Sequence, residues 1–377
     1  MAPAINDRNL SVRKSAFDFA EEFIGSRPEL HSQKEFPLDI WKGLGSKGLL
    51  GLGIPRKFGG GGGDYLSIAV AGHALTAGGN NLGCAVAWLM HLLTARFFIL
   101  IQGTSRQHRA FLPDMAAGRK TACLAISEPQ GGSHPKYLTT TAEHTGSHYI
   151  LSGKKTFLTN ALIADLFIVF AVVGEDQDRK RFSAFVVPKE SQGLMLAEAL
   201  DLGFLHPCHH GGIVMNGCKV SKKDLLGNYG SAYEDMALPF REVEDALMMG
   251  PISGGIRSMC GSLARVIKEQ AVPLREDLDA RIGEIGADAS VLEMLAYEAA
   301  RILDSRPRRK ELLPLLIFSR RVAVQLQAKF KTLVESAGIH TDPSFDNMAN
   351  DLERIVRIAS NVANIKQRKL GRILLEQ

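Results

Sequence analysis

The stretch CLAISEPQGGSH, residues 123–134, gathers groups that could do chemistry. Two hydroxyls (Ser127 and Ser133), a carboxylate (Glu128) and paired glycines fall within it. A phosphate-binding P-loop needs Gly-x-x-x-x-Gly-Lys-Ser/Thr, a dinucleotide-binding turn needs Gly-x-Gly-x-x-Gly, and a nucleophile elbow needs Gly-x-Ser-x-Gly. This stretch matches none of the three patterns. Taken alone, it predicts a glycine-rich β-turn.

The segment HPCHH offers a second cluster of reactive side chains, His206, Cys208, His209 and His210. Imidazole and thiolate groups bind zinc, but a tetrahedral site needs ligands that converge on one point. Residues one or two apart on an extended segment rarely converge, and the sequence has no second ligand cluster elsewhere. We therefore predict no metal site and a solvent-facing β-loop at this segment.

The elements that must position these residues change type twice along the chain. Apolar steps of three and four residues, together with long apolar runs, predict an N-terminal α-helical domain over residues 1–120. Short β-branched and aromatic runs bounded by Gly, Pro and Ser predict a middle antiparallel β-barrel domain over 121–232. Helical periodicity returns in a C-terminal helical bundle domain over 233–377. The fold class is therefore α+β.

Composition narrows the class of protein. The chain has 377 residues, 45% of them hydrophobic and 23% charged, which suits two or three globular domains. The net charge of +5 comes from scattered basic residues, which does not favour nucleic-acid binding but is compatible with nucleotides or coenzyme A. Five separated cysteines, no secretory-type segment and no membrane span of roughly 20 apolar residues predict a cytoplasmic protein.

Several motifs occur in a fixed order around the opening stretch. FPLDIWKGLGSKGLLGLGIPRKFGGGG and GTSRQHRAFLPDMAAGRKTACLAISEP precede it, and YILSGKKTFLTNALIADLFIVFA follows it. In this order they resemble the acyl-CoA dehydrogenase family, over about residues 10–260 and weakly beyond. The resemblance implies FAD held between a middle β-domain and a C-terminal four-helix bundle, an acyl-CoA substrate, and a homotetramer or homodimer. In that family a base removes a proton from Cα of the thioester while hydride moves from Cβ to the flavin.

The resemblance also implies site residues. The positions implied for cofactor binding are Leu124, Ile126, Ser127, Phe157 and Thr159. Ser127 stands in place of the more usual Thr, Phe157 where an aromatic ring covers the flavin, and Thr159 where a hydroxyl meets the ring or ribityl chain. Ser133 matches a serine that approaches the CoA part of the substrate. The alternative is that Ser127 and Thr159 satisfy strand ends and that Phe157 is a core residue.

The family carries its base at one of two places. Near the C-terminus, IASNVANIKQRKLGRILL puts Ser360 at the Glu position, and the apolar spacing through 352–373 predicts an uninterrupted helix there. At the start of the bundle, LPFREVEDALMMGP puts Val243 at the Glu position, between Glu242 and Glu244. One helical position rotates a side chain by about 100°, so both flanking acids are expected to be solvated surface groups. Glu244 is a fallback candidate, and the base is left unassigned.

Three functions remain open on these residues. The leading one is an FAD-dependent acyl-CoA dehydrogenase-like oxidoreductase of fatty acid metabolism that passes electrons to an electron-transferring flavoprotein. The second is a flavin-dependent monooxygenase on the same fold, which needs no α-proton base. The third is a non-catalytic subunit in a heteromer with a catalytic relative. It is favoured by the joint loss of both base positions and of an Arg-x-x-Phe-Gly element. In the family that element contacts FAD across the dimer, and it has no counterpart in GSLARVIKEQAVPLREDLDARIGEIG.

Overall fold

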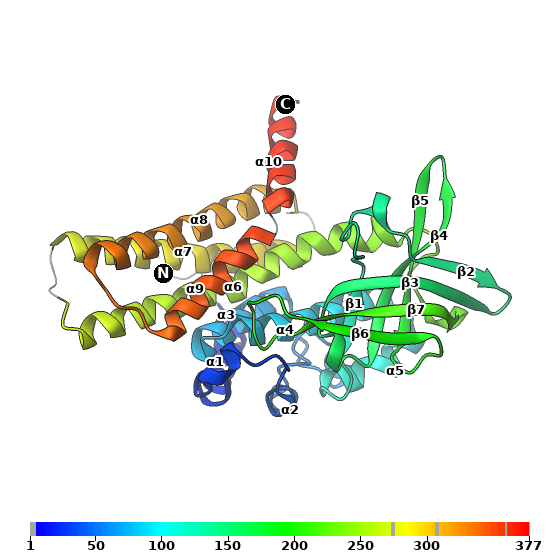
Figure 1. Cartoon of the computed structure of the whole chain (residues 1–377), viewed down its shortest axis with the longest axis horizontal. Coiled ribbons are helices and arrows are strands. Elements are labelled where there is room, and N and C mark those ends of the chain that lie inside the picture. Colours follow the sequence, from blue (N-terminus) through cyan, green and yellow to red (C-terminus); the bar gives the residue numbers. More distant parts are fainter. Residues whose placement is uncertain (1–4, 273–275, 306–308, 359, 377) are drawn as a thin grey trace.

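Helices, strands and helices follow one another along the chain, from blue through green to red in Figure 1. The computed structural model describes residues 5–272, 276–305, 309–358 and 360–376. The strands form a lobe at one end of the molecule, and the long C-terminal helices extend toward the other end (Figure 1). The N-terminal helices lie beneath both in this view.

The N-terminal part is helical and largely buried. Its helices are α1 (Asp7–Ala20), α2 (Leu38–Ser46), α3 (Tyr65–Gly79), α4 (Leu82–Leu93) and α5 (Ser105–Ala116). A π-helical segment, Thr94–Leu100, continues α4. The run Leu82–Leu100 is long and apolar enough to cross a membrane by length and composition, more so than the sequence led us to expect. Because 94% of its apolar window is buried inside the protein, its composition is accounted for by burial in the core.

The middle part is one mixed sheet. Its strands are β1 (Ala122–Ala125), β2 (Thr141–Thr145), β3 (His148–Thr159), β4 (Leu166–Asp176), β5 (Arg179–Pro188), β6 (Leu194–Leu200), β7 (His210–Ser221) and β8 (Leu225–Leu226). They follow the order β6-β7-β3-β2-β4-β5-β8, and β1 pairs with β4. Most pairs are antiparallel as predicted, but β1–β4 and β2–β4 are parallel. The chain between β1 and β4 includes the β2–β3 hairpin, which is long enough to let β4 run parallel to β1.

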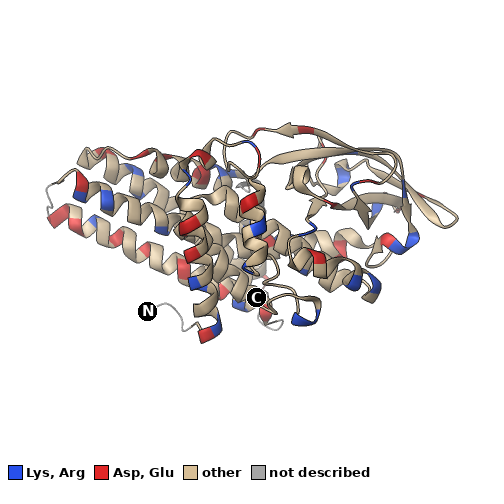
Figure 2. Cartoon of the chain, turned by 90° about the horizontal axis from the view of Figure 1, so that it is seen from below, with Lys and Arg blue, Asp and Glu red and all other residues tan. Residues whose placement is uncertain are grey.

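The C-terminal part consists of long helices. These are α6 (Leu238–Glu269), α7 (Glu276–Asp304), α8 (Arg309–Ala337), α9 (Pro343–Ile358) and α10 (Ser360–Leu375). Figure 2 shows charges of both signs interspersed along them. Some of these charges pair across helices: Lys329 of α8 lies 2.6 Å from Glu284 and 2.5 Å from Asp288, both on α7.

The predicted uninterrupted helix through 352–373 is wrong. Helix α9 ends at Ile358, and α10 begins at Ser360 and projects away from the bundle (Figure 1). Leu352 of α9 is fully buried, whereas Ile365 of α10 is 58% exposed. The apolar stripe read from the sequence therefore does not form one buried face.

Helix α6 packs unusually close to α3 through two glycines one turn apart. A Cβ on Gly250 would lie 2.6 Å from the carbonyl oxygen of Ala69, and a Cβ on Gly254 would lie 2.2 Å from that of His73. Real Cβ atoms do not approach so closely, so this contact requires glycine at both positions. The contact fixes the rotation of α6 about its own axis, and with it the directions in which the first turns of α6 point.

We predict that Gly254→Ala lowers the free energy of unfolding by about 1–3 kcal/mol, because the added methyl group must push the two helices apart. Urea denaturation followed by circular dichroism measures this change. The control is Gly261→Ala on the same helix, where a Cβ meets nothing within 4 Å. There we expect a gain of about 0.5–1 kcal/mol. Equal effects of the two substitutions would contradict the close-contact interpretation.

Candidate active site

A pocket of about 150 Å³ lies where the N-terminal helices, the sheet and α6 meet. All of the residues predicted to contact cofactor or substrate line it: Leu124, Ile126, Ser127, Ser133, Phe157 and Thr159. The other walls include Met90 of α4 and Thr94 of the π-helical segment. Phe240, Arg241 and Glu244 enter from α6. Residues from three parts of the chain thus converge on one hollow.

The loop after β1 is held from within by a buried ion pair. The Lys155 ammonium, 2% exposed, donates to the carbonyl oxygen of Ile126 at 3.0 Å and to Glu128 Oε1 at 2.9 Å. The Glu128 carboxylate also accepts from the backbone N–H groups of Thr139 and Thr140, at 2.7 and 2.9 Å. Burial would raise the pKa of Glu128, but Lys155 and the hydrogen bonds hold that pKa at about 2. Burial lowers the pKa of Lys155 to about 8, against the pull of Glu128. Both groups are therefore charged at neutral pH.

Phe157 stands at an irregularity in β3. The register of β3 against β7 shifts between Lys155 and Leu158, and Phe157 has a φ of 57°, which is rare for a residue other than glycine. The neighbouring Thr156 N–H donates to the carbonyl oxygen of Ser127 at 2.9 Å, which ties this bulge to the loop after β1. Phe157 is 53% exposed and lines the pocket, so it is not a core residue. Such backbone strain is concentrated at functional sites.

Thr159 has a partner that sequence reasoning missed. Its hydroxyl lies 3.2 Å from Nε2 of His210, the first residue of β7. Burial lowers the pKa of His210 to about 4, so its imidazole is neutral at neutral pH. The pairing of Thr159 with His210 across β3 and β7 brings the two side chains together. No local sequence motif predicts this contact.

The HPCHH segment is not the solvent-facing loop that we predicted. Cys208, His209 and His210 are 4%, 5% and 8% exposed. The chain just before them is anchored to α9, because the backbone N–H of Leu205 donates to Asp351 Oδ1 at 2.8 Å. The segment is also bonded near the end of β3, because the His209 carbonyl oxygen accepts from the backbone N–H of Asn160 at 3.3 Å, so it lies between the sheet and α9 rather than in solvent. Within the described ranges, no group of three or more His, Cys, Asp or Glu residues is placed to hold a metal ion.

Arg241 joins α6 to the glycine-rich loop. Its Nη2 donates to the carbonyl oxygen of Ser133 at 3.1 Å and to the Ser133 hydroxyl oxygen at 3.2 Å. The guanidinium carbon also lies 5.8 Å from the centre of the Tyr233 ring. This link spans 108 residues of sequence, and no spacing rule predicts it. It places a cation at the Ser133 side of the pocket.

Glu244 is not the solvated surface acid that we expected. Val243 is fully buried, and the next position along α6 turns Glu244 into the pocket. Among the described residues that line this pocket, Glu244 is the one carboxylate. Burial first and the neighbouring Asp245 second raise its pKa to about 7, although Arg241 acts in the opposite direction. The Ser360 side chain, at the other position where the family carries a base, lies outside the described part of the chain.

Known proteins are similar to this chain in sequence and in fold. The chain matches the acyl-CoA dehydrogenase N-terminal domain over residues 6–119 and the acyl-CoA dehydrogenase middle domain over residues 123–219. It is 30% identical over 305 residues to the short-chain specific acyl-CoA dehydrogenase of Rattus norvegicus mitochondria, covering 78% of this chain and 70% of that protein. The chain belongs to the acyl-CoA dehydrogenase family. Members of this family bind FAD.

Two further proteins match this chain almost end to end. The caffeyl-CoA reductase-Etf complex subunit CarC of Acetobacterium woodii is 25% identical over 386 residues, 99% of each chain. The solved structure of butyryl-CoA dehydrogenase from Megasphaera elsdenii superposes with a TM-score of 0.87 at 21% identity, covering 100% of each chain. At that identity the likeness establishes the fold, with its N-terminal helical, middle β and C-terminal helical parts.

The residues present fit the ring portion of FAD. Phe157 offers a half-exposed aromatic face, and Ser127 and Thr159 bring hydroxyl groups to the same pocket. A flat conjugated ring favours such stacking and such hydrogen-bond partners. The buried Lys155–Glu128 pair fixes the backbone that carries Ile126 and Ser127.

We predict that Lys155→Met destabilises the protein by about 3–5 kcal/mol, because it leaves the Glu128 carboxylate buried without its counterion. The free energy of unfolding in urea at pH 7 measures this loss. Lys154→Met, at the exposed neighbouring position on the same strand, should change it by less than about 0.5 kcal/mol. Adding Glu128→Gln to Lys155→Met should restore part of the loss. If the two lysine variants are equally stable, the ion pair does not hold this loop.

Proposed function

We propose that this chain is an FAD-dependent oxidoreductase that carries out α,β-dehydrogenation of an acyl-CoA thioester, with Glu244 as the proton acceptor. The observation that carries the proposal is the position of Glu244. Its carboxylate lines the same pocket as all of the residues implied for flavin and thioester binding. A base displaced by one position from its usual place in the family is therefore still in reach of the site.

Dehydrogenation of a thioester requires a base of this kind. The α C–H of a thioester is weakly acidic, and a base works best when its pKa lies near the working pH. Glu244, with a pKa of about 7, is partly ionised at neutral pH and takes the Cα proton onto a carboxylate oxygen. Bound FAD supplies the acceptor for the hydride that leaves Cβ. The Cα–H and Cβ–H bonds break, and a Cα=Cβ double bond forms.

The other residues of the pocket position the reactants. Ser127 and Thr159 would offer hydrogen bonds to the flavin, and the Phe157 ring would pack on it. Ser133 and Arg241 lie at the side assigned to the CoA part, where a guanidinium suits the anionic phosphates of coenzyme A. Met90 and Phe240 supply apolar walls that exclude water from the proton transfer.

The name of the Acetobacterium woodii relative, a subunit of a reductase–Etf complex, supports an electron-transferring flavoprotein as the redox partner of this chain. We place the enzyme in the cytoplasm, as its composition predicts. A homodimer or homotetramer is expected from the family.

We predict that the kcat/KM for acyl-CoA oxidation rises with pH through about 7, because Glu244 accepts a proton only when ionised, and levels off above about pH 8. Glu244→Gln should lower the rate of anaerobic flavin bleaching at pH 8 by at least ~100-fold. Glu242→Gln, two positions earlier on α6, should change it by less than about twofold. Stopped-flow absorbance across a panel of acyl-CoA thioesters gives both results. A Glu244→Gln enzyme that bleaches as fast as the unmodified enzyme would remove Glu244 from the proposal.

We also predict that the purified protein shows a flavin absorption band and that Phe157→Ala weakens FAD binding about 3–10-fold through the loss of ring stacking. The matched control is Tyr137→Ala. Tyr137 has the same 53% exposure on the same lobe but does not line the pocket. Titration with FAD, followed by visible absorbance, measures the affinity. A protein that binds no flavin even in excess FAD would instead be the non-catalytic subunit. A flavin that no thioester bleaches would favour the monooxygenase.

A further inference from the structure

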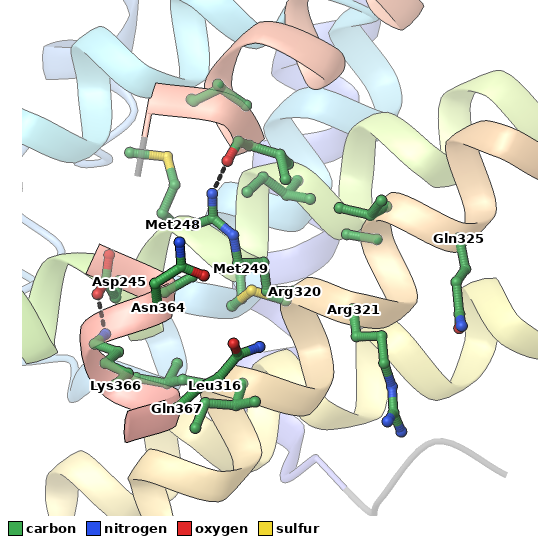
Figure 3. A pocket seen from close by; sticks show the side chains of 17 residues that line it. Asp245, Met248, Met249, Leu316, Arg320, Arg321, Gln325, Asn364, Lys366 and Gln367 are labelled. Atoms are coloured by element: carbon green, nitrogen blue, oxygen red, sulfur yellow. Dashed lines mark hydrogen bonds and ion pairs between the residues drawn. The ribbon is translucent and has the colours of Figure 1, made fainter. Parts of the chain in front are cut away.

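A second and larger hollow lies in the C-terminal bundle. It has a volume of about 450 Å³ and lies between α6, α8, α9 and α10 (Figure 3). No described residue lines both this hollow and the Glu244 pocket. Asp245, which lines the larger one, follows Glu244 by about 100° around α6, so the two hollows open on different sides of that helix. We call the larger hollow the bundle pocket.

The walls of the bundle pocket suit a flexible hydrocarbon chain. Met248, Met249 and Ile252 enter from α6, Leu316 from α8 and Val356 from α9. Its volume lies in the range of roughly 300–1,000 Å³ that is usual for small-molecule sites. Methionine side chains are unbranched and adapt to the shape of an apolar ligand. These five side chains form an apolar wall, and Gln325, Asn364 and Gln367 add polar groups elsewhere in the lining.

The charges of the bundle pocket favour an anion. Lys366 of α10 points toward Asp245 of α6 and forms an ion pair with it, so these two charges balance (Figure 3). Arg320 of α8 forms no ion pair among the described residues, and its one hydrogen bond there goes to the carbonyl oxygen of Val356. A guanidinium has five N–H donors, so most of those on Arg320 remain available.

Arg320 is also the arginine that a ligand would meet inside the pocket. Its side chain lies among the other lining residues, whereas Arg321 extends away from them (Figure 3). The guanidinium carbon of Arg321 lies 4.8 Å from the centre of the Phe318 ring. Burial lowers the pKa of Arg320, although Asp245 acts against this, so an anion beside it would compensate a partly desolvated cation.

We propose that the bundle pocket binds an unbranched aliphatic carboxylate, with its chain along Met248 and Met249 and its carboxylate on Arg320. A planar guanidinium pairs with a carboxylate through two parallel hydrogen bonds. A neutral hydrocarbon would make no hydrogen bond to the Arg320 guanidinium, and a small inorganic anion would leave the apolar walls unfilled. The site is independent of the dehydrogenation proposed for the Glu244 pocket.

Isothermal titration calorimetry of the full-length protein with decanoate, below its micelle-forming concentration, tests the site directly. We expect saturable binding, and decan-1-ol, which has the same chain but no charge, should bind at least ~10-fold more weakly because it makes no charge-assisted hydrogen bond. Equal binding of the alcohol would overturn the carboxylate assignment. Absence of decanoate binding would overturn the site.

Variants on α8 and α9 locate the binding. Arg320→Met keeps most of the side-chain volume and should weaken decanoate binding at least ~10-fold. Arg357→Met removes an equal charge from an exposed position of α9 that does not line the pocket, and should leave the affinity within about twofold. Val324→Trp narrows the pocket from its half-exposed rim without removing a hydrogen bond, and should abolish decanoate binding. This variant tests the site even if Arg320→Met fails to fold.

The same variants separate this site from the Glu244 pocket. No described residue of α8 lines that pocket, so decanoate bound there would survive both Arg320→Met and Val324→Trp. Binding that persists in both variants would overturn the proposal. The calorimetric measurement requires neither FAD nor turnover. It therefore tests the bundle pocket independently of the proposed dehydrogenase activity.

Discussion

The buried ion pair between Lys155 and Glu128 is the interaction on which the candidate active site depends. It joins the loop after β1 to the bulged part of β3, and these two segments carry most of the residues implied for flavin binding. A buried pair is weak evidence of net stabilisation, because removing two charges from water costs several kcal/mol per ion. Here the lysine also bonds the Ile126 carbonyl oxygen, and the glutamate bonds two backbone amides. We infer that its contribution is to fix the conformation of the loop after β1.

Residues that belong to a local motif were the predictable ones. Ser127 and Phe157 lie in short segments whose order and spacing resemble those of the family. The structure brings both residues into one pocket. Their contacts with FAD stay a prediction. The order of helices, strands and helices was equally visible, because the apolar period changes from about 3.6 to 2 and back.

What the sequence hid depends on contacts between distant segments. Glu244 could not be told from a surface acid, because its direction is set by the packing of α6 on α3 rather than by its neighbours in sequence. Arg241 reaches a loop more than a hundred residues away, and the chain shortly before the buried His210 is bonded to Asp351 of α9. The break between α9 and α10 was hidden as well, because the apolar spacing continues through α10 although Ile365 is exposed.

The two glycines of α6 have a consequence for how this site can change in evolution. Gly250 and Gly254 hold α6 against the backbone of α3. The direction of each earlier side chain on the helix therefore depends on the number of residues between it and these glycines. An insertion or deletion of one residue between Glu244 and Gly250 would swing the carboxylate by about 100° and take it out of the pocket. Substitutions before the glycines can be accepted one at a time, whereas changes in length there cannot. The interval between this acid and this glycine pair is therefore a property that functional descendants of the chain should inherit unaltered.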